Sequence, residues 1–328
     1  MYPIPAVLNE RTLFPHPPVR TLTQNTLYVL TGPTAVGKTA VALELAERLG
    51  SPIISADSRQ MFRDIPIGTA APTPEEQRRV KHYFVGTLSL DVQYSAARYE
   101  TEALALLESL FQTHQHLVLS GGSMLYIDAV CKGIDRMPDV DPEVRQRLKE
   151  RLETEGLQVL VDELRVRDPE YAARCDLKNH VRVVHALEVC LTTGRTFTSF
   201  RQREQETEGN GARKERPFRI VKIGLNRERA ELFDRINRRV DLMVEQGFVE
   251  EARRVIPYRH LNSLNTVGYK EMFRHLDGEW DLPFTLDRIR KNTRVYAKKQ
   301  LTWFLRDDTI RWFHPTAQFD DILRYVGV

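Results

Sequence analysis

The chain has 328 residues, of which 41% are hydrophobic and 28% charged, and its formal net charge is +3. This is the composition of an ordinary globular protein, and no apolar run is long enough to cross a bilayer, so we expect no membrane-spanning segment. The small net charge does not by itself indicate a nucleic-acid partner, and local clusters of charge must decide that question.

The N-terminal region and the cysteines predict a cytoplasmic protein. Residues 1–26 contain five prolines and no apolar run long enough for a signal peptide, so we expect a flexible tail. Arg11 and Arg20 in that tail leave organellar targeting as the alternative. Three widely spaced cysteines predict a reducing compartment without disulfides: Cys131, Cys175 and Cys190.

Strands and helices alternate in the first part of the chain. The short apolar segment Leu27–Thr31 predicts a buried strand, and the spacing of apolar residues predicts a helix over Thr39–Leu49. Ile53–Asp57 and Leu117–Ser120 predict two further strands, with a helix over Ala96–Gln112 between them. This alternation predicts an α/β fold in which helices flank a parallel sheet.

The pattern changes after Pro138. Residues 139–202 contain no clear strand, and three charged helices are predicted there: Pro142–Thr154, Leu157–Arg165 and Val181–Thr192. Residues 203–216 are polar and lack an apolar face, which predicts a mobile loop. A strand over Phe218–Leu225 and long helices over Arg229–Gln246 and Phe284–Arg306 then follow. We therefore predict a core formed by 27–138 and 217–328, interrupted by an all-helical insertion at 139–202.

A phosphate-binding loop follows the first predicted strand. The motif G-x-x-x-x-G-K-[ST] is matched by Gly32, Pro33, Thr34, Ala35, Val36, Gly37, Lys38 and Thr39. Glycines let backbone N–H groups face an anion, the helix start adds its positive dipole end, Lys38 adds a charge and Thr39 a hydroxyl for Mg²⁺. A glycine turn that binds nothing is the alternative. The motif indicates a phosphate rather than ATP itself.

Two further features refine this prediction. Leu117–Ser120 is followed by Gly121-Gly122-Ser123 and by no acid, which disfavours nucleotide hydrolysis. Asp57 closes the predicted strand Ile53–Asp57, so its carboxylate should face the same cleft as the phosphate loop. There it can be a general base or a ligand of metal-bound water, or it can merely cap the turn. Its position alone does not separate these roles.

A basic helix is the local cluster that favours RNA. The segment Asp287–Arg306 holds seven basic residues against one acid, and Lys291, Arg294 and Lys298 fall on one face. A solvated helix face is the alternative interpretation. His180 and His185 lack a third ligand nearby in the sequence, so we predict no zinc site.

Ten short sequence motifs occur in the order typical of one enzyme family. They are GPTAVGKT, SADSRQMF, IGTAAPT, YSAARY, SGGSMLY, DPEVR, HALEV, RINRR, NTVGYKEM and AKKQLTWF. From about Leu27 to about Pro315 the chain thus resembles the tRNA dimethylallyltransferases, the isopentenyl-tRNA transferase family. The resemblance implies transfer of a dimethylallyl group from dimethylallyl diphosphate to the 6-amino group of the adenine immediately 3′ of the anticodon. It also implies Mg²⁺ and a phosphate loop that holds the prenyl diphosphate, and we expect a monomer.

The resemblance also implies roles for single residues. Asp57 matches the general base, Arg239 a clamp on the diphosphate and Ser123 the hydroxyl of a G-G-[TS] turn; with Lys38 they form the expected catalytic set. Positions that match tRNA contacts are Asp57, Ser58, Arg59, Gln60, Ser123, Arg145, Val181, Arg182, Val183, Val184, His185, Ser263, Leu264, Asn265, Thr266, Val267 and Gly268. His185 and Asn265 depart from the residues of many relatives.

Three other functions compete with this one. A prenyltransferase acting on free adenine nucleotides would share the phosphate loop and Asp57, but has less need of a helical insertion that grips RNA. A P-loop nucleotide kinase would usually carry the acid that is missing after Leu117–Ser120. A non-catalytic RNA-binding module would have no use for the intact loop.

Overall fold

The protein is built on a parallel six-stranded sheet, as predicted. The computed structural model describes residues 25–135, 137–201 and 215–327, so nearly all of the predicted tail and loop 203–216 lies outside the described residues. The strand order is β3-β2-β4-β1-β5-β6, and all neighbours are parallel. The strands are β1 (Thr26–Thr31), β2 (Ile53–Ser55), β3 (His82–Tyr83), β4 (His116–Ser120), β5 (Arg219–Leu225) and β6 (Ile310–Phe313).

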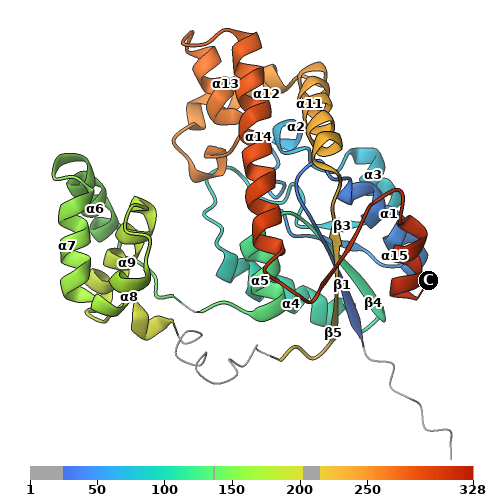
Figure 1. The fold of residues 1–328 in the computed structure, drawn as a ribbon, viewed down its shortest axis with the longest axis horizontal. Helices are drawn as coiled ribbons and strands as arrows, with labels where there is room; N and C mark the ends of the chain where they lie inside the picture. The colour runs from blue at the N-terminus through green and yellow to red at the C-terminus, as the bar shows by residue number, and fades with distance from the viewer. Residues whose placement is uncertain (1–24, 136, 202–214, 328) are drawn as a thin grey trace, which may run out of the picture.

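Helices cover both faces of this sheet (Figure 1). They are α1 (Lys38–Leu49), α4 (Ala96–Leu110), α5 (Met124–Lys132), α11 (Arg229–Glu245), α14 (Leu282–Phe304) and α15 (Phe319–Val326). Leu27 and Val29 of β1 belong to a core completed by α4 and α5, whereas Tyr28 and Leu30 belong to a core completed by α1, α11 and α15. Successive side chains of a strand point to opposite faces, so a strand covered on both faces requires a continuous apolar run.

A group of helices stands at the end of the sheet where β1 runs into the phosphate loop (Figure 1). Their cluster buries Phe248, Tyr269 and Met272 together with parts of α11 and α14. The additional elements at this end are α2 (Pro66–Thr69), α3 (Pro74–Arg79), α12 (Phe248–Val255), η2 (Ile256–Tyr258), η3 (Asn262–Leu264) and α13 (Tyr269–Leu276). This cluster forms a wall above the carboxyl ends of the strands, where ligands of such sheets bind.

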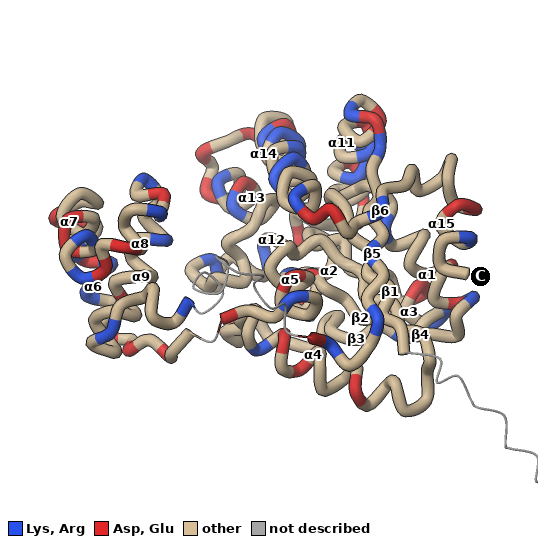
Figure 2. Tube along the Cα trace, turned by 60° about the horizontal axis from the view of Figure 1, so that its bottom comes forward, with Lys and Arg blue, Asp and Glu red and all other residues tan. Residues whose placement is uncertain are grey.

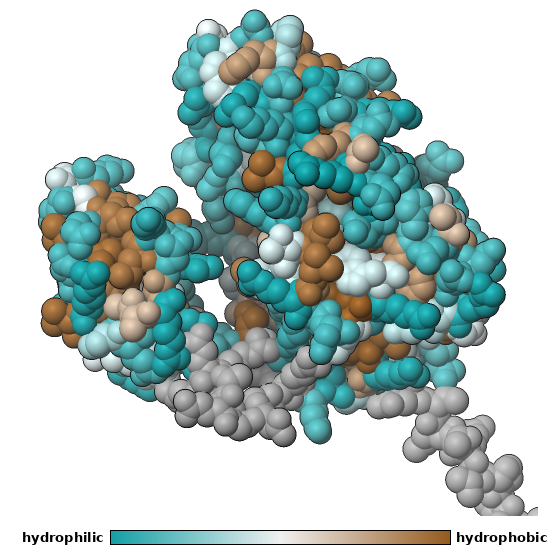
Figure 3. All heavy atoms as spheres, viewed as in Figure 1, coloured by the Kyte–Doolittle hydropathy of each residue, from teal (hydrophilic) through white to brown (hydrophobic). Residues whose placement is uncertain are grey.

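The segment between α5 and β5 folds around a hydrophobic cluster of its own. Its elements are α6 (Pro142–Thr154), α7 (Leu157–Arg167), α8 (Pro169–Arg174), α9 (His180–Thr193) and η1 (Thr198–Phe200), and residues 137–201 contain no strand. Leu148, Leu160 and Leu187 are fully buried in this cluster. In Figure 3 these helices form a smaller lobe beside the larger body, with apolar residues showing on the face toward the viewer.

The observed elements differ from the predicted ones mainly at their ends. Strand β2 stops at Ser55, so Asp57 lies two residues beyond it rather than closing it. Short elements such as β3 and α2 were not predicted, because two to four residues carry no measurable periodicity. Among the described residues, no helix is both long and apolar enough to cross a membrane. All three cysteines are free thiols.

Candidate active site

The phosphate loop connects β1 to α1 and depends on its first glycine. Gly32 has φ +147°, and a Cβ at this position would lie 2.5 Å from the carbonyl oxygen of Leu225 in β5. Any larger residue would push the loop away from the neighbouring strand. Gly37, with φ +109°, ends the loop and places Lys38 at the first position of α1. The loop therefore meets the start of a helix, as the motif predicts.

Side-chain cations hold the carbonyl oxygens of this loop. The donors and acceptors are Lys38 Nζ to Gly32 O and Pro33 O at 2.9 Å each, Arg235 Nε to Ala35 O at 2.8 Å, and Arg227 Nε to Val36 O at 2.7 Å. Carbonyl oxygens carry partial negative charge, so an anion binds only where they point away from it. Four fixed carbonyl groups therefore give the loop one defined shape.

A cavity of about 500 Å³ opens in front of the loop. Its walls come from the phosphate loop, the carboxyl ends of β2 and β4, and the facing sides of α11 and α14. Lys38, Arg235, Arg238 and Arg239 line it together with two carboxylates, those of Asp57 and Glu76. The volume is typical of a small-molecule site, and the excess of cations favours an anionic ligand.

Lys38 and Arg239 line this cavity, and burial affects the pKa of both side chains. The pKa of Lys38 is lowered to about 8, mainly by burial; Asp57 opposes this shift and Arg239 adds to it. Arg239 donates to Thr34 Oγ1 and to the carbonyl oxygen of Thr69, each at 3.2 Å, and burial lowers its pKa as well. Two cations that share a poorly solvated space are stabilised by an incoming polyanion.

Asp57 combines a structural contact with a position in the cavity. Its Oδ1 accepts the backbone N–H groups of Arg59 at 2.9 Å and Gln60 at 3.3 Å, so the carboxylate caps the turn. The same side chain lines the cavity beside Lys38. The capping role considered for this residue is therefore present, and it is compatible with a role in the reaction.

Ser123 and the glycines before it fix the turn that carries Asp57. The hydroxyl of Ser123 accepts the N–H of Ser58 at 2.8 Å and donates to the hydroxyl of Ser58 at 3.1 Å. A Cβ on Gly121 would lie 2.1 Å from the carbonyl oxygen of Ala56, which leaves no room for a side chain. The G-G-S turn after β4 is therefore packed directly against the Asp57 turn.

Arg59 joins two of the predicted RNA-contacting stretches. Its Nη1 donates to the carbonyl oxygens of Asn262 at 2.8 Å and Ser263 at 3.2 Å. The side chains of Ser263 and Leu264 are buried, whereas Asn265 is exposed. Thr266 and Val267 are half-buried, and Gly268 is buried at the start of α13.

The predicted tRNA-contacting residues of the helical insertion also include both exposed and buried side chains. Arg145 forms an ion pair with Glu188 at 3.1 Å, and His185 Nδ1 lies 3.4 Å from the other carboxylate oxygen of Glu188. Val181 and Arg182 are exposed on α9. The side chains of Val183 and Val184 are buried in the hydrophobic cluster of the insertion.

Basic residues recur along α14 (Figure 2), and some of those on the predicted face make contacts within the protein. Arg294 stacks over the ring of Phe233 at 5.5 Å, and Arg290 forms an ion pair with Asp241 of α11. These arginines bind α14 to α11. Lys291 and Lys298 of the predicted stripe are exposed, as is Lys299. The available positive charge on this helix is therefore carried by lysines.

Two residues of α14, Tyr296 and Gln300, line the cavity although the sequence did not assign them to it. Gln300 accepts the N–H of Thr34 at 2.8 Å and donates to the carbonyl oxygen of Gly122 at 2.8 Å, so it joins the phosphate loop to the turn after β4. Tyr296 lines the cavity one helical turn earlier, and burial raises its pKa to about 12. Their spacing of four residues was the available signal, since it places both on one face of a helix.

No group of three or more His, Cys, Asp or Glu side chains that could hold a metal ion occurs in residues 25–135, 137–201 or 215–327. The hydroxyl of Thr39 and the carboxylate of Asp57 do line the same cavity. Magnesium needs few protein ligands when phosphate oxygens and water complete its octahedron. This donor set therefore fits a magnesium ion that arrives with a diphosphate.

Comparison with known proteins gives a consistent result. The model of the IPP transferase family matches residues 60–307. A protein of Phocaeicola vulgatus named tRNA dimethylallyltransferase 1 is 59% identical over 302 residues, covering 92% of this chain and 98% of that protein. A protein of Bacteroides thetaiotaomicron with the same name is 58% identical over 92% of this chain and 95% of its own length. The crystal structure of a tRNA isopentenylpyrophosphate transferase from Bacillus halodurans is similar with a TM-score of 0.66 at 34% identity, covering 93% of this chain and 96% of that one.

Proposed function

The chain belongs to the IPP transferase family of tRNA dimethylallyltransferases, and from this membership we propose the reaction that it catalyses. It transfers a dimethylallyl group from dimethylallyl diphosphate to the 6-amino group of the adenine immediately 3′ of the anticodon in tRNA. The observation that supports this most directly is the single cavity in which the phosphate loop, Arg239 and Asp57 meet.

We assign the diphosphate to the loop side of this cavity. Lys38, Arg239 and the N–H groups of the loop neutralise the charge that grows on the leaving group as the allylic C–O bond breaks. Thr39, at the start of α1, is the protein ligand that we expect for Mg²⁺, which supplies further charge when bound with the diphosphate. Because an adenine amine is a poor nucleophile, most of the catalysis must act on this electrophile.

Asp57 is assigned to the amine. The N6 lone pair forms the new C–N bond to the allylic carbon, the C–O bond breaks, and the proton of N6 passes to the Asp57 carboxylate. The contacts of Oδ1 with Arg59 and Gln60 orient this carboxylate, and the contact between Ser123 and Ser58 holds the turn in place. Ser123 then acts on the reaction by positioning the base.

The RNA must present a base that is unstacked from the anticodon loop and flipped into the protein. Gln60 lies at the cavity wall, and Asn265 is exposed on the stretch that Arg59 holds beside it. The exposed Val181 and Arg182 and the half-exposed Arg145 and His185 are the contacts that we propose in the insertion. Single-stranded loops are recognised through such base edges and stacking surfaces, and we expect one monomer to bind one tRNA.

The other enzymatic functions are not favoured by the family membership. Strand β4 ends in Ser120 and passes into Gly121 and Gly122, so the carboxylate that a kinase would use at this point is absent from the turn. A free nucleotide would leave the exposed positions of the insertion without a partner. Both alternatives remain as outcomes of the assays below.

Incubation with radiolabelled dimethylallyl diphosphate and unmodified tRNA tests the proposal. We expect label in tRNA, and after digestion to nucleosides all of it in isopentenyladenosine from the position 3′ of the anticodon. Replacing that adenine by guanine in an otherwise identical tRNA is the control, and it should abolish incorporation. Label at another nucleoside, or no incorporation with a folded protein, would exclude the proposed reaction.

A further inference from the structure

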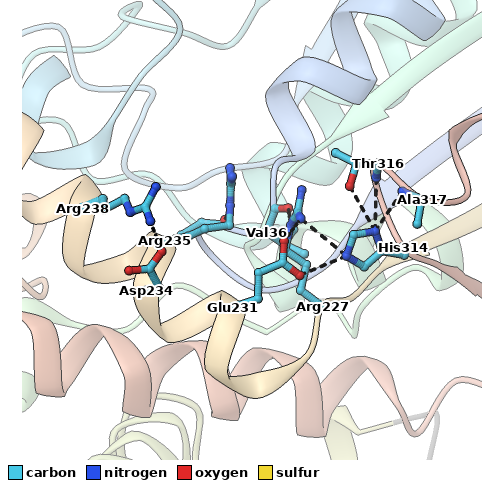
Figure 4. A network of polar contacts seen from close by, with 10 residues as sticks. Val36, Arg227, Glu231, Asp234, Arg235, Arg238, His314, Thr316 and Ala317 are labelled. Carbon is cyan, nitrogen blue, oxygen red and sulfur yellow. Dashed lines mark hydrogen bonds and ion pairs between the residues drawn. The ribbon is translucent and has the colours of Figure 1, made fainter.

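A buried arginine supports the phosphate loop from behind (Figure 4). Arg227 lies just before α11, and only 4% of its side chain is exposed. It does not line the cavity, whereas Gly37, on the loop in front of it, does. A buried guanidinium needs acceptors for its N–H groups, and their identity shows what the residue holds in place.

Arg227 binds one carbonyl group of the loop and one carboxylate. Its Nε donates to Val36 O at 2.7 Å, and its Nη1 donates to the carboxylate of Glu231, one turn into α11. A Cβ on Gly37 would lie 3.5 Å from Nη2, so the guanidinium is packed against the last turn of the loop. Val36 itself is fully buried, so water does not offer its carbonyl group an equivalent partner.

His314 anchors this pair to the turn after β6. Its Nδ1 accepts the N–H of Ala317 at 3.0 Å, which leaves the ring proton of the neutral imidazole on Nε2. That Nε2 lies 3.0 Å from Glu231 Oε2 and donates to it. Hydrogen bonds from His314 and Arg227 lower the pKa of the Glu231 carboxyl. Arg227 and His314 therefore hold the Glu231 carboxylate from two sides. The carboxylate in turn fixes the orientation of Arg227.

The geometry of the peptide bond gives this contact a consequence in the cavity. The carbonyl of Val36 and the N–H of Gly37 belong to one peptide plane, and in a trans peptide they point in opposite directions. The chain contains no cis peptide among its described residues. Drawing the carbonyl oxygen back toward Arg227 therefore turns the N–H of Gly37 forward, toward the side of the loop that lines the cavity.

We propose that Arg227 is a positioning residue that aims the Gly37 N–H at the diphosphate, and that Glu231 and His314 hold Arg227 in the orientation this requires. The inference rests on the proposed function for the identity of the diphosphate ester. It names a residue that does not touch the substrate and acts only through the loop.

The first test replaces Arg227 by methionine, which keeps much of the volume and removes every donor. We expect the KM for dimethylallyl diphosphate to rise at least tenfold, because a charge-assisted hydrogen bond to the diphosphate is lost, while the Kd for tRNA stays within about twofold. Arg227→Lys should recover part of the loss, because an ammonium can reach the Val36 carbonyl group but cannot bind Val36 and Glu231 with the geometry of a guanidinium. Arg324→Met is the matched control, an exposed arginine of α15 in an ion pair with Asp321.

A milder variant covers the case in which Arg227→Met does not fold. His314→Asn keeps an acceptor near the position of Nδ1 for Ala317 and removes the donor to Glu231, and the residue is partly exposed. We expect a KM increase of about two- to fivefold with kcat unchanged, as for the loss of one hydrogen bond that acts at a distance. A purely structural role would lower the melting temperature or the active fraction and leave KM unchanged.

Calorimetry with inorganic diphosphate separates this inference from the proposed function. We expect wild-type protein and Arg324→Met to bind diphosphate equally, and Arg227→Met and His314→Asn to bind it more weakly at temperatures where they are folded. Equal affinity in a folded Arg227→Met, or no binding by the wild type, overturns the inference. Failure of prenyl transfer with intact diphosphate binding overturns only the proposed reaction.

Discussion

Lys38 is the residue whose charge should depend most on pH in the working range. Burial lowers its pKa to about 8, so in the free protein the ammonium loses its proton as the pH rises through that value. We expect kcat/KM for dimethylallyl diphosphate to fall above about pH 8, because this ratio reports groups of the free enzyme. A bound diphosphate favours the charged form, so kcat should stay constant to higher pH.

The pH profile of Lys38→Arg is the control for this assignment. Arginine keeps its charge throughout the range, so the decline above about pH 8 should disappear even if the overall rate is lower. A decline that persists unchanged in Lys38→Arg would assign the titration to a different group, and Lys38 would then not be the cation that matters for binding.

Asp57 allows its two roles to be separated by two substitutions. Asp57→Asn retains an oxygen that can accept the N–H groups of Arg59 and Gln60, so the turn should keep its cap while the base is lost. We expect diphosphate affinity close to that of the wild type and a chemical rate lower by about 10²–10⁴, measured in single-turnover experiments. Asp57→Ala removes the cap as well and should additionally lower the melting temperature. Equal rates for wild type and Asp57→Asn would show that Asp57 is not the base.

At the scale of elements, the short helix α2 links Arg239 to the side chain of Gln60. The carbonyl oxygen of Thr69 at its end accepts Arg239 at 3.2 Å, and that of Ala70 accepts Gln60 Nε2 at 3.0 Å. The start of α2 is held by the fully buried Glu251, whose carboxylate accepts the N–H groups of Ile67 at 2.9 Å and Gly68 at 2.7 Å. A helix of four residues has little stability of its own, so this carboxylate determines its position.

We therefore expect Glu251→Ala to destabilise the protein by about 2–4 kcal/mol, since two backbone donors lose a charged acceptor. Tyr269→Phe, which removes the hydroxyl that also donates to Glu251, should cost about 1 kcal/mol and is the matched comparison. Urea denaturation followed by fluorescence measures both values. If α2 is positioned in another way, the two variants will have equal stability.

Elements with a long periodic pattern could be predicted from the sequence, whereas contacts between distant segments could not. Helix α6 was predicted to the residue because Asp141, Pro142 and the apolar spacing mark its start and its face. The burial of Val183 and Leu264 was not predicted, because a match to the motifs of a family identifies positions but does not show which side chains point into the core. Arg227 was missed for a related reason, because Val36 precedes it by 191 residues and His314 follows it by 87 residues, and only the assembled sheet brings these residues together.

At the scale of the whole molecule, the helical insertion forms a smaller lobe beside the body that contains the cavity, which we propose binds the diphosphate (Figure 3). Arg182 is exposed on α9 of the insertion, and Asn265 is exposed after η3 in the larger body. The division of the chain into a core and an RNA-binding insertion remains a prediction. If this prediction is right, the enzyme must select its acceptor through contacts with the anticodon stem-loop and not through the adenine alone.

Acceptor choice is the measurement that tests this account most directly. The values of kcat/KM for dimethylallyl transfer are compared for an anticodon stem-loop, AMP, ADP and ATP at equal concentrations of dimethylallyl diphosphate. Binding energy from the loop orients the reacting amine, so we predict efficient transfer to the stem-loop, little or none to the free nucleotides, and no phosphoryl transfer from ATP. Transfer to AMP, ADP or ATP with an efficiency equal to that for the stem-loop, or phosphoryl transfer from ATP without use of dimethylallyl diphosphate, would contradict it.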